Sequence, residues 1–282
     1  EQAAQRRMRF VLSRTARASS TEAQPTSLHG PARYVAWAVC SIPVLLGFGL
    51  PVLFMLRPML AAWNALPWDR FVQWSLNSLR LGGITAALAV GIALTLAFFA
   101  RRRGDRLASG VMQLASLGYA IPGAVVVVGL LLPVGWLQQV APALQAGYWV
   151  TATLLGLVWA YLVRFCAVAL QSVQSGYARI TPSLDESALM LGVGGWRLMQ
   201  QVHWPLLKRS TAAAALLVFV DVMKELPATL VLRPFDSDTL AVVAYQLARD
   251  ERLGEAAVPS LTLVVVGLLP VILLSRTMRR NG

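Results

Sequence analysis

Charged residues are scarce in this sequence of 282 amino acids, and their scarcity excludes an ordinary water-soluble domain. Asp, Glu, Lys and Arg make up 13% of the chain, against 57% hydrophobic residues, and the mean hydropathy is +0.61. A soluble domain averages about 25% charged and about 45–50% apolar residues. The apolar residues come in runs of about 20, a length that crosses about 30 Å of hydrocarbon as a helix. The composition therefore predicts an integral membrane protein.

Residues that build metal and disulfide sites are also few. Cys40 and Cys166 lie far apart inside apolar runs, and their spacing matches no zinc or disulfide motif. Two small buried hydrophobic residues are the simpler interpretation. The two histidines, His29 and His203, have no ligand partner nearby in the sequence, so no firm metal site is predicted.

A nucleotide site and a catalytic centre are not predicted. A P-loop needs Gly-Lys followed by Ser or Thr, whereas the only lysines, Lys208 and Lys224, follow Leu and Met. No nucleophile–base pair is seen near the end of any apolar run. The chain is therefore predicted to be no enzyme and to bind no cofactor, and any ATP would be used by a partner chain.

The sequence does contain six apolar runs, which predict an all-α, polytopic membrane domain over residues 31–282. The predicted spans are Tyr34–Leu56, Leu79–Ala100, Gly110–Leu132 with Pro122 and Gly123 in its middle, Val150–Leu170, Thr211–Leu232 and Ala256–Ser275. Residues 1–30 are polar and basic and are predicted to be a cytoplasmic linker or arm.

The basic residues predict the orientation. The formal charge of +12 would suggest nucleic acid in a soluble protein, but the basic residues here lie mainly between spans, so no nucleic-acid partner is predicted. Cytoplasmic N- and C-termini place most Lys and Arg inside, in the arm, in 101–109, in 171–210 and in the tail. The prediction is a multi-pass membrane protein with both termini in the cytoplasm, surrounded by lipid.

The longest interior loop predicts a short helix. Ser183 and Glu186 have the spacing of a capping box, and Thr181 before a helix that begins at Pro182 is an equally good start. The helix is expected to end near Gly192–Gly195.

A second amphipathic piece, Trp196 to Val202, is expected to stop before Pro205. Two short helices joined at a glycine corner predict a docking surface for a soluble partner over residues 181–209. The alternative is a loop that is stabilised by its own packing.

The loop resembles the EAA loop of binding-protein-dependent ABC permeases: Glu-Ala-Ala, three residues, Gly, nine residues, Ile, two residues, Pro. The matching residues are Glu186, Ser187, Ala188, Gly192, Val202 and Pro205, with Ser187 in place of Ala and Val202 in place of Ile. The resemblance covers roughly Ser75 to Arg276. It implies the type I ABC importer permease fold.

In that family the first short helix is the coupling helix, which sits in a groove of the ATPase subunit. The small residues Ser187, Ala188 and Gly192 are expected to allow that close approach. The resemblance implies three partners: ATPase subunits, a periplasmic binding protein and a second permease module, either fused or separate.

The fifth predicted span carries Asp221, Lys224 and Glu225, followed by Pro227. Charges at that depth are costly, so they usually face a cavity or one another. The spacing predicts one helical face, and Pro227 predicts an interrupted helix, as in transporter sites. The residues are candidates for the translocation path; alternatively, an Asp–Lys pair only organises packing.

The stretch 224–235, with 238–241 and 250–252, resembles ferric-iron importer permeases, which usually carry two fused six-span modules. This chain looks like the C-terminal module, which would account for its linker-like start. The resemblance implies import of ferric iron, with Asp221 and Glu225 as transient oxygen ligands. Another cargo (thiamine, phosphonate or polyamine) and an ion-coupled secondary transporter are the alternatives.

Overall fold

The computed structural model describes residues 29–103 and 106–279, which form helices and turns without a β-strand. It divides into two compact units, residues 1–53 and 54–282, and each is described by itself. The predicted linker, 1–30, lies almost wholly outside the described residues.

One long apolar helical stretch begins in the first unit. Helix α2 (Pro31–Val44) begins with a proline, continues through a π turn (Leu45–Gly49) and enters α3 (Leu50–Ala62). No side chain of these three segments is buried. A helix that is apolar on all sides suits a lipid environment. The first predicted span is confirmed, and the structure extends it at both ends.

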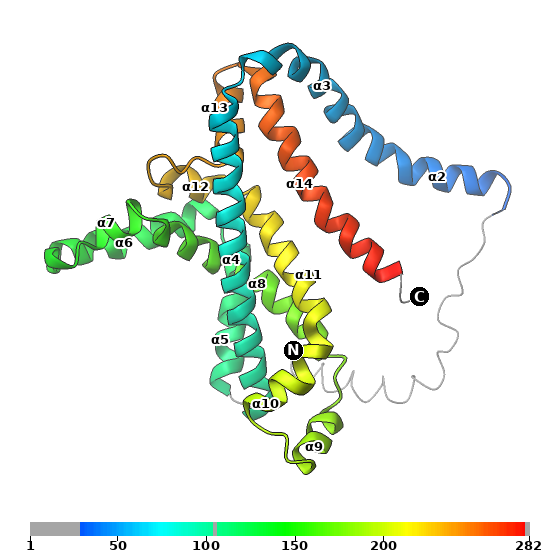
Figure 1. The fold of residues 1–282 in the computed structure, drawn as a ribbon, viewed down its shortest axis with the longest axis vertical. Helices are drawn as coiled ribbons and strands as arrows, with labels where there is room; N and C mark the ends of the chain where they lie inside the picture. The colour runs from blue at the N-terminus through cyan, green and yellow to red at the C-terminus, as the bar shows by residue number, and fades with distance from the viewer. Residues whose placement is uncertain (1–28, 104–105, 280–282) are drawn as a thin grey trace. The chain divides into compact units, whose positions relative to one another are not determined.

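The core of the second unit is formed by α4 (Trp68–Arg103), α8 (Leu154–Tyr177) and α11 (Trp204–Met223), which pack against one another (Figure 1). Alanines line these contacts, and Ala93, Ala160 and Ala214 are completely buried. Small side chains let helix backbones approach closely, which favours helix packing in a membrane.

The third predicted span is wrong as a single helix. The structure has α5 (Arg106–Leu117), a 3-10 turn and then α6 (Gly123–Val140), with Ile121 extended at φ −83° and ψ 127°. Pro122 explains the break, because a proline disfavours helical backbone in the residue before it. From this break α6 and α7 (Ala146–Thr151) project away from α4 (Figure 1).

The fifth predicted span is interrupted before Pro227, which confirms the predicted break at this proline. Helix α11 ends at Met223 and α12 (Pro227–Leu232) starts a new helix at the proline. The structure then adds α13 (Leu240–Arg249), which the sequence analysis did not predict, and α14 (Leu253–Arg279).

Length and composition select five membrane-crossing helices among the described residues, against about six predicted. They are Pro31–Ala65, Trp68–Arg101, Gly123–Val140, Leu154–Tyr177 and Leu253–Ile272. Helix α11 is not among them; it carries Lys208, Arg209 and Asp221. The all-α, polytopic fold is confirmed.

The C-terminal ends of α4 and α8 and the start of α11 lie at one end of this unit (Figure 1). Helix α9 (Pro182–Met190) and α10 (Trp196–Leu198) follow at that end, whereas α13 lies at the opposite end. The interior regions 101–109 and 171–210 were predicted to share one side, and this arrangement agrees with that prediction.

Candidate functional site

The loop after α8 contains the predicted helix and its glycine corner. Helix α9 begins at Pro182 with Thr181 as its N-cap, so this start, rather than the capping box at Ser183, is observed. Beyond its end, Gly192 has φ +79° and Gly195 has φ +61°. Glycine adopts this left-handed backbone without steric cost, which explains the two glycines at the corner.

The second piece of the loop does not stop before Pro205, contrary to the prediction. Helix α10 runs through a π turn (Met199–His203) directly into α11, and Pro205 occupies the first turn of α11. A proline inside a continuous helix removes one helical hydrogen bond and crowds the preceding turn, and here the π turn just before it already alters the hydrogen-bond pattern.

The residues that match the EAA pattern do not all face outward. Glu186, Ser187, Gly192 and Pro205 are exposed and Val202 is half-buried, but Ala188 is only 7% exposed. Ala188 is therefore buried, whereas Ser187 and Gly192 remain exposed; that these small residues allow the close approach of a partner stays a prediction.

The most exposed part of the loop is apolar. Met190 is 90% exposed and Leu191 is 82% exposed, and Leu189 beside them is also exposed. A contiguous exposed apolar patch of this kind marks an interaction surface. We call residues 189–191 the apolar tip of the loop.

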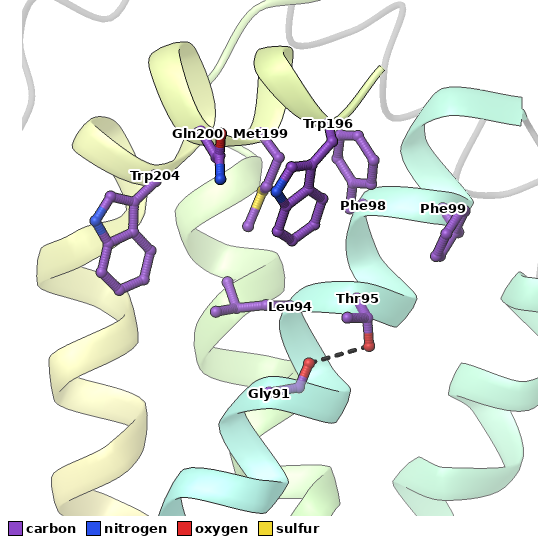
Figure 2. Close-up of a pocket in the computed structure, with 9 residues that line it drawn as sticks. All are labelled: Gly91, Leu94, Thr95, Phe98, Phe99, Trp196, Met199, Gln200 and Trp204. Atoms are coloured by element: carbon purple, nitrogen blue, oxygen red, sulfur yellow. Dashed lines mark hydrogen bonds between the residues drawn. The ribbon is translucent and has the colours of Figure 1, made fainter.

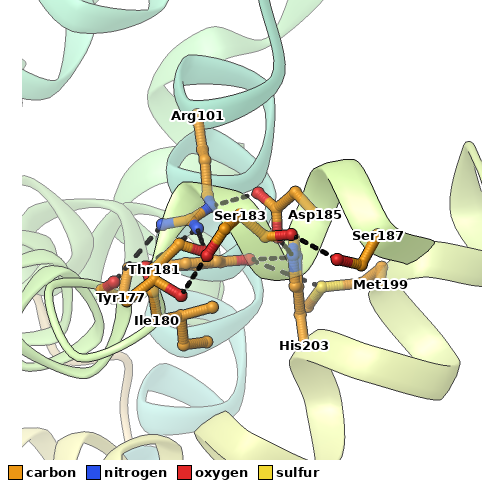
Figure 3. Close-up of polar contacts among 9 residues, drawn as sticks. All are labelled: Arg101, Tyr177, Ile180, Thr181, Ser183, Asp185, Ser187, Met199 and His203. Atoms are coloured by element: carbon orange, nitrogen blue, oxygen red, sulfur yellow. Dashed lines mark hydrogen bonds and ion pairs between the residues drawn. The ribbon is translucent and has the colours of Figure 1, made fainter. Parts of the chain in front are cut away.

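Helix α9 is fastened to the end of α4 by Arg101 (Figure 3). The Arg101 Nε donates to Asp185 Oδ2 at 2.6 Å, and its other nitrogens donate to the carbonyls of Tyr177, Ile180 and Thr181 at 2.9–3.3 Å. One guanidinium therefore holds the end of α8 and the start of α9 in place.

Asp185 also connects α9 to the start of α11. Its Oδ1 lies 3.0 Å from Nε2 of His203, and Nδ1 of His203 lies 3.3 Å from the Tyr177 hydroxyl. Burial alone would raise the pKa of Asp185, but the hydrogen bonds from Arg101 and His203 outweigh it and lower that pKa. The aspartate therefore stays ionised between two donors. We call Arg101, Asp185 and His203 the loop clamp.

The sequence analysis missed the loop clamp. Arg101 was considered only as one of the basic residues that orient the spans, and His203 only as a metal ligand. No group of three metal-ligating side chains occurs in the part of the chain that the structure describes. Arg101 and Asp185 are 84 residues apart, so no local spacing signals their pairing.

The charged residues of the fifth predicted span separate into two sites. Lys224 pairs with Asp221 at 2.8 Å and is 66% exposed. Glu225 instead pairs with Arg164 of α8 at 2.6 Å. The predicted single face is wrong, because α11 ends at Met223 and helical spacing does not extend to Glu225.

The Glu225 carboxylate is buried and fully used, with its side chain 2% exposed. It accepts bonds from the backbone N–H groups of Ala228 and Thr229 at 3.1–3.2 Å and from the Thr229 hydroxyl at 3.1 Å. The Tyr161 hydroxyl lies 2.6 Å from that of Thr229. In this conformation Glu225 fixes the start of α12 and has no free oxygen for a passing ion.

Arg164 is the other residue that the sequence analysis missed, since its place within a span gave it no role there. Its Nη1 binds Glu225, while its buried Nε has no hydrogen-bond partner among the described residues. Gly123 at the start of α6 approaches this pair so closely that an added Cβ would lie 2.6 Å from Glu225 Oε1. The pair thus joins α6, α8 and the α11–α12 break.

Residues 83–280 match the sequence model of the family described as "Binding-protein-dependent transport system inner membrane component". The match contains both the loop clamp and the Arg164–Glu225 pair.

Two relatives differ in the share of their own length that aligns with this chain. The Fe(3+)-transport system permease protein FbpB 2 of Haemophilus influenzae is 26% identical over 235 residues, which are 82% of this chain and 45% of that protein. This chain therefore spans about half the length of that relative. The putative 2-aminoethylphosphonate transport system permease protein PhnV of Salmonella typhimurium is 27% identical over 233 residues, 83% of either chain.

A solved structure shares the fold. A chain of the bacterial alginate ABC transporter, crystallised with an alginate pentasaccharide-bound periplasmic protein, aligns with a TM-score of 0.68. The alignment covers 88% of this chain and 94% of that chain at 15% sequence identity.

Proposed function

Because the chain belongs to the binding-protein-dependent transport system inner membrane component family, we propose that it is a permease module of a bacterial ABC importer for ferric iron. In this proposal, a periplasmic binding protein delivers the cargo at the α13 end, and an ATPase subunit binds at the α9 end. A second permease module completes the channel. Family membership argues against an ion-coupled secondary transporter.

The observation that carries the coupling proposal is the apolar tip on a loop that is clamped to the membrane helices. The tip offers Met190 and Leu191 to a partner, and Asp185 connects the helix that bears them to Arg101 of α4 and His203 before α11. A push on α9 is therefore passed to two core helices at once. This is what alternating access driven by a separate ATPase requires.

Uptake by two Gly192 variants tests the coupling. Space beside Gly192 is open, since an added Cβ meets no atom within 4 Å, and Asp and Asn tolerate left-handed backbone better than other residues. We expect Gly192→Asp to insert into the membrane normally and to abolish uptake, because a charge there opposes docking of the ATPase. Gly192→Asn is the matched neutral variant. It adds a side chain of nearly the same size without the charge, so comparing uptake by the two variants separates the effect of the charge from that of the added bulk.

The assay is uptake of labelled ferric iron by cells that lack the permease and carry the full-length gene, with membrane levels of each variant measured. Unchanged uptake with Gly192→Asp at normal membrane levels would refute the coupling role. No iron uptake even with the wild-type gene would remove the iron proposal and leave the permease assignment standing.

The cargo proposal is supported by the 224–235 stretch and by the likeness to an iron permease. Aminoethylphosphonate is the second candidate, favoured by a relative that aligns over 83% of both chains. Which periplasmic binding protein stimulates ATP hydrolysis by the assembled transporter decides between them. Thiamine and polyamine binding proteins belong in the same screen.

A further inference from the structure

An apolar groove of about 280 Å³ lies between the end of α4 and the α10–α11 segment (Figure 2). Leu94 and Phe98 line it from α4, and Trp196, Met199 and Trp204 line it from the other side. The groove lies close to the loop clamp, and neither the coupling proposal nor the cargo proposal uses it.

The groove offers few polar side chains to an occupant. The Thr95 hydroxyl donates to the carbonyls of Gly91 and Ile92 at 3.0 and 2.8 Å, so it offers no donor to a ligand (Figure 2). Gln200 contributes the other polar side chain. An occupant of this groove must therefore be a hydrocarbon over the part that enters it.

Cationic side chains flank the groove on the same segment. Lys208 lies one turn after Trp204, on the same face of α11, and it is exposed. Arg197 is adjacent to Trp196 and is also exposed. Neither side chain has an ion pair or hydrogen bond to another described residue, so both remain available to an anion.

We propose that the groove holds an acyl chain of an anionic phospholipid whose phosphate contacts Lys208. Indole rings and basic side chains together are typical of the membrane–water interface, and basic pockets between membrane helices bind anionic headgroups. The charge beside the groove thus selects a lipid over an uncharged apolar partner. Protein contact is assigned instead to the apolar tip on α9.

The proposed lipid would support the loop clamp from behind. Phe98, which lines the groove, packs edge-on against His203 with ring centroids 5.7 Å apart. Met199, which also lines it, accepts from the Tyr177 hydroxyl at 3.6 Å. An occupied groove therefore holds the side chains that position His203 against Asp185.

A matched pair of glycine variants on α4 tests the groove. Gly91 lines the groove and Gly83 does not, and an added Cβ at either position meets no atom within 4 Å. Gly91→Leu places a branched side chain at the groove from an unobstructed Cβ, and Gly83→Leu makes the same change two turns away. The full chain, purified in detergent, is incubated with phosphatidylglycerol or phosphatidylcholine, and the bound lipid is counted by native mass spectrometry.

We expect wild type and Gly83→Leu to retain phosphatidylglycerol in preference to phosphatidylcholine, and Gly91→Leu to retain about tenfold less. Lys208→Gln should remove the headgroup preference while keeping a bound lipid, whereas Arg249→Gln, an exposed cation at the other end, should change neither. Excess inorganic phosphate should not displace the lipid.

Three results would overturn the proposal. Equal retention by the Gly91 and Gly83 variants would place the lipid elsewhere. Absence of a headgroup preference in wild type would refute the phosphate contact. Loss of the lipid from the assembled transporter, with the isolated chain still binding it, would show that a protein surface covers the groove.

Discussion

At the scale of single residues, Asp185 is the point through which α9 is held to the membrane helices. Replacing it by Asn removes the charge between Arg101 and His203 and leaves an amide N–H facing a donor. We expect Asp185→Asn to lower stability by about 1–3 kcal/mol and to reduce uptake strongly in protein that still inserts. Uptake per membrane-inserted chain measures this.

The control for that variant is Asp69→Asn, which removes an exposed carboxylate from the first turn of α4. Its uptake should match wild type. Normal uptake with Asp185→Asn would show that the loop clamp does not transmit the motion.

The lowered pKa of Asp185 also predicts a pH dependence. The pKa of Asp185 is lower in the folded than in the unfolded chain. Such a carboxyl group stabilises the folded state at pH values above its unfolded pKa, and this contribution is lost as the pH falls through its folded pKa. Lowering pH from about 6 to about 3 crosses the ordinary Asp pKa of about 3.9. The melting temperature of wild type should fall more over this interval than that of Asp185→Asn; equal falls would contradict the prediction.

At the scale of elements, α6 and α12 meet at the Arg164–Glu225 pair. Gly123, at the start of α6, is the residue that lies against this pair. An added Cβ would lie 2.6 Å from Glu225 Oε1 and 2.9 Å from Arg164 Nη1. Glu225 is held by several bonds and cannot yield easily, so we expect Gly123→Ala to cost about 1–3 kcal/mol.

Gly129→Ala is the matched change on α6, because an added Cβ there meets no atom within 4 Å. It should be neutral or stabilise by up to about 1 kcal/mol, since alanine favours helix. Thermal unfolding of both purified variants measures the difference. Equal stabilities would mean that the Arg164–Glu225 pair adjusts freely.

At the scale of the whole second unit, α4 connects the α9 end with the opposite end. There, Phe235 is fully exposed on the segment between α12 and α13. This segment is held by an Arg233–Asp238 ion pair of 2.6 Å and by Asn77 of α4, whose Nδ2 donates to the carbonyls of Asp236 and Asp238 at 3.2 Å. A rigid segment that presents an aromatic ring suits contact with a binding protein.

We therefore expect Phe235→Ala to reduce, by about tenfold, the stimulation of ATP hydrolysis by the cognate binding protein in the assembled transporter. Leu253→Ala is the control, because Leu253 at the start of α14 is also an exposed apolar side chain, at 64%. A similar loss with both variants, or with neither, would contradict a specific contact at Phe235.

The sequence by itself determined the membrane class, most spans, the α9 helix and its glycine corner. Each of these depends on residues close together in the chain: runs of apolar side chains, a proline at a helix start, glycines where the backbone is left-handed. Local pattern also predicted the break at Pro227, whereas the predicted third span continued through Pro122 because it followed hydropathy alone.

Only the tertiary structure decided which charges meet. Arg101 and Asp185 are 84 residues apart and Arg164 and Glu225 are 61 apart, and pairing at such distances depends on how the helices pack. Spacing rules apply within one continuous helix, so they assigned Glu225 to the face of Asp221 after the helix had already ended at Met223. The groove beside Trp204 likewise exists only because α4 and the α10–α11 segment come together.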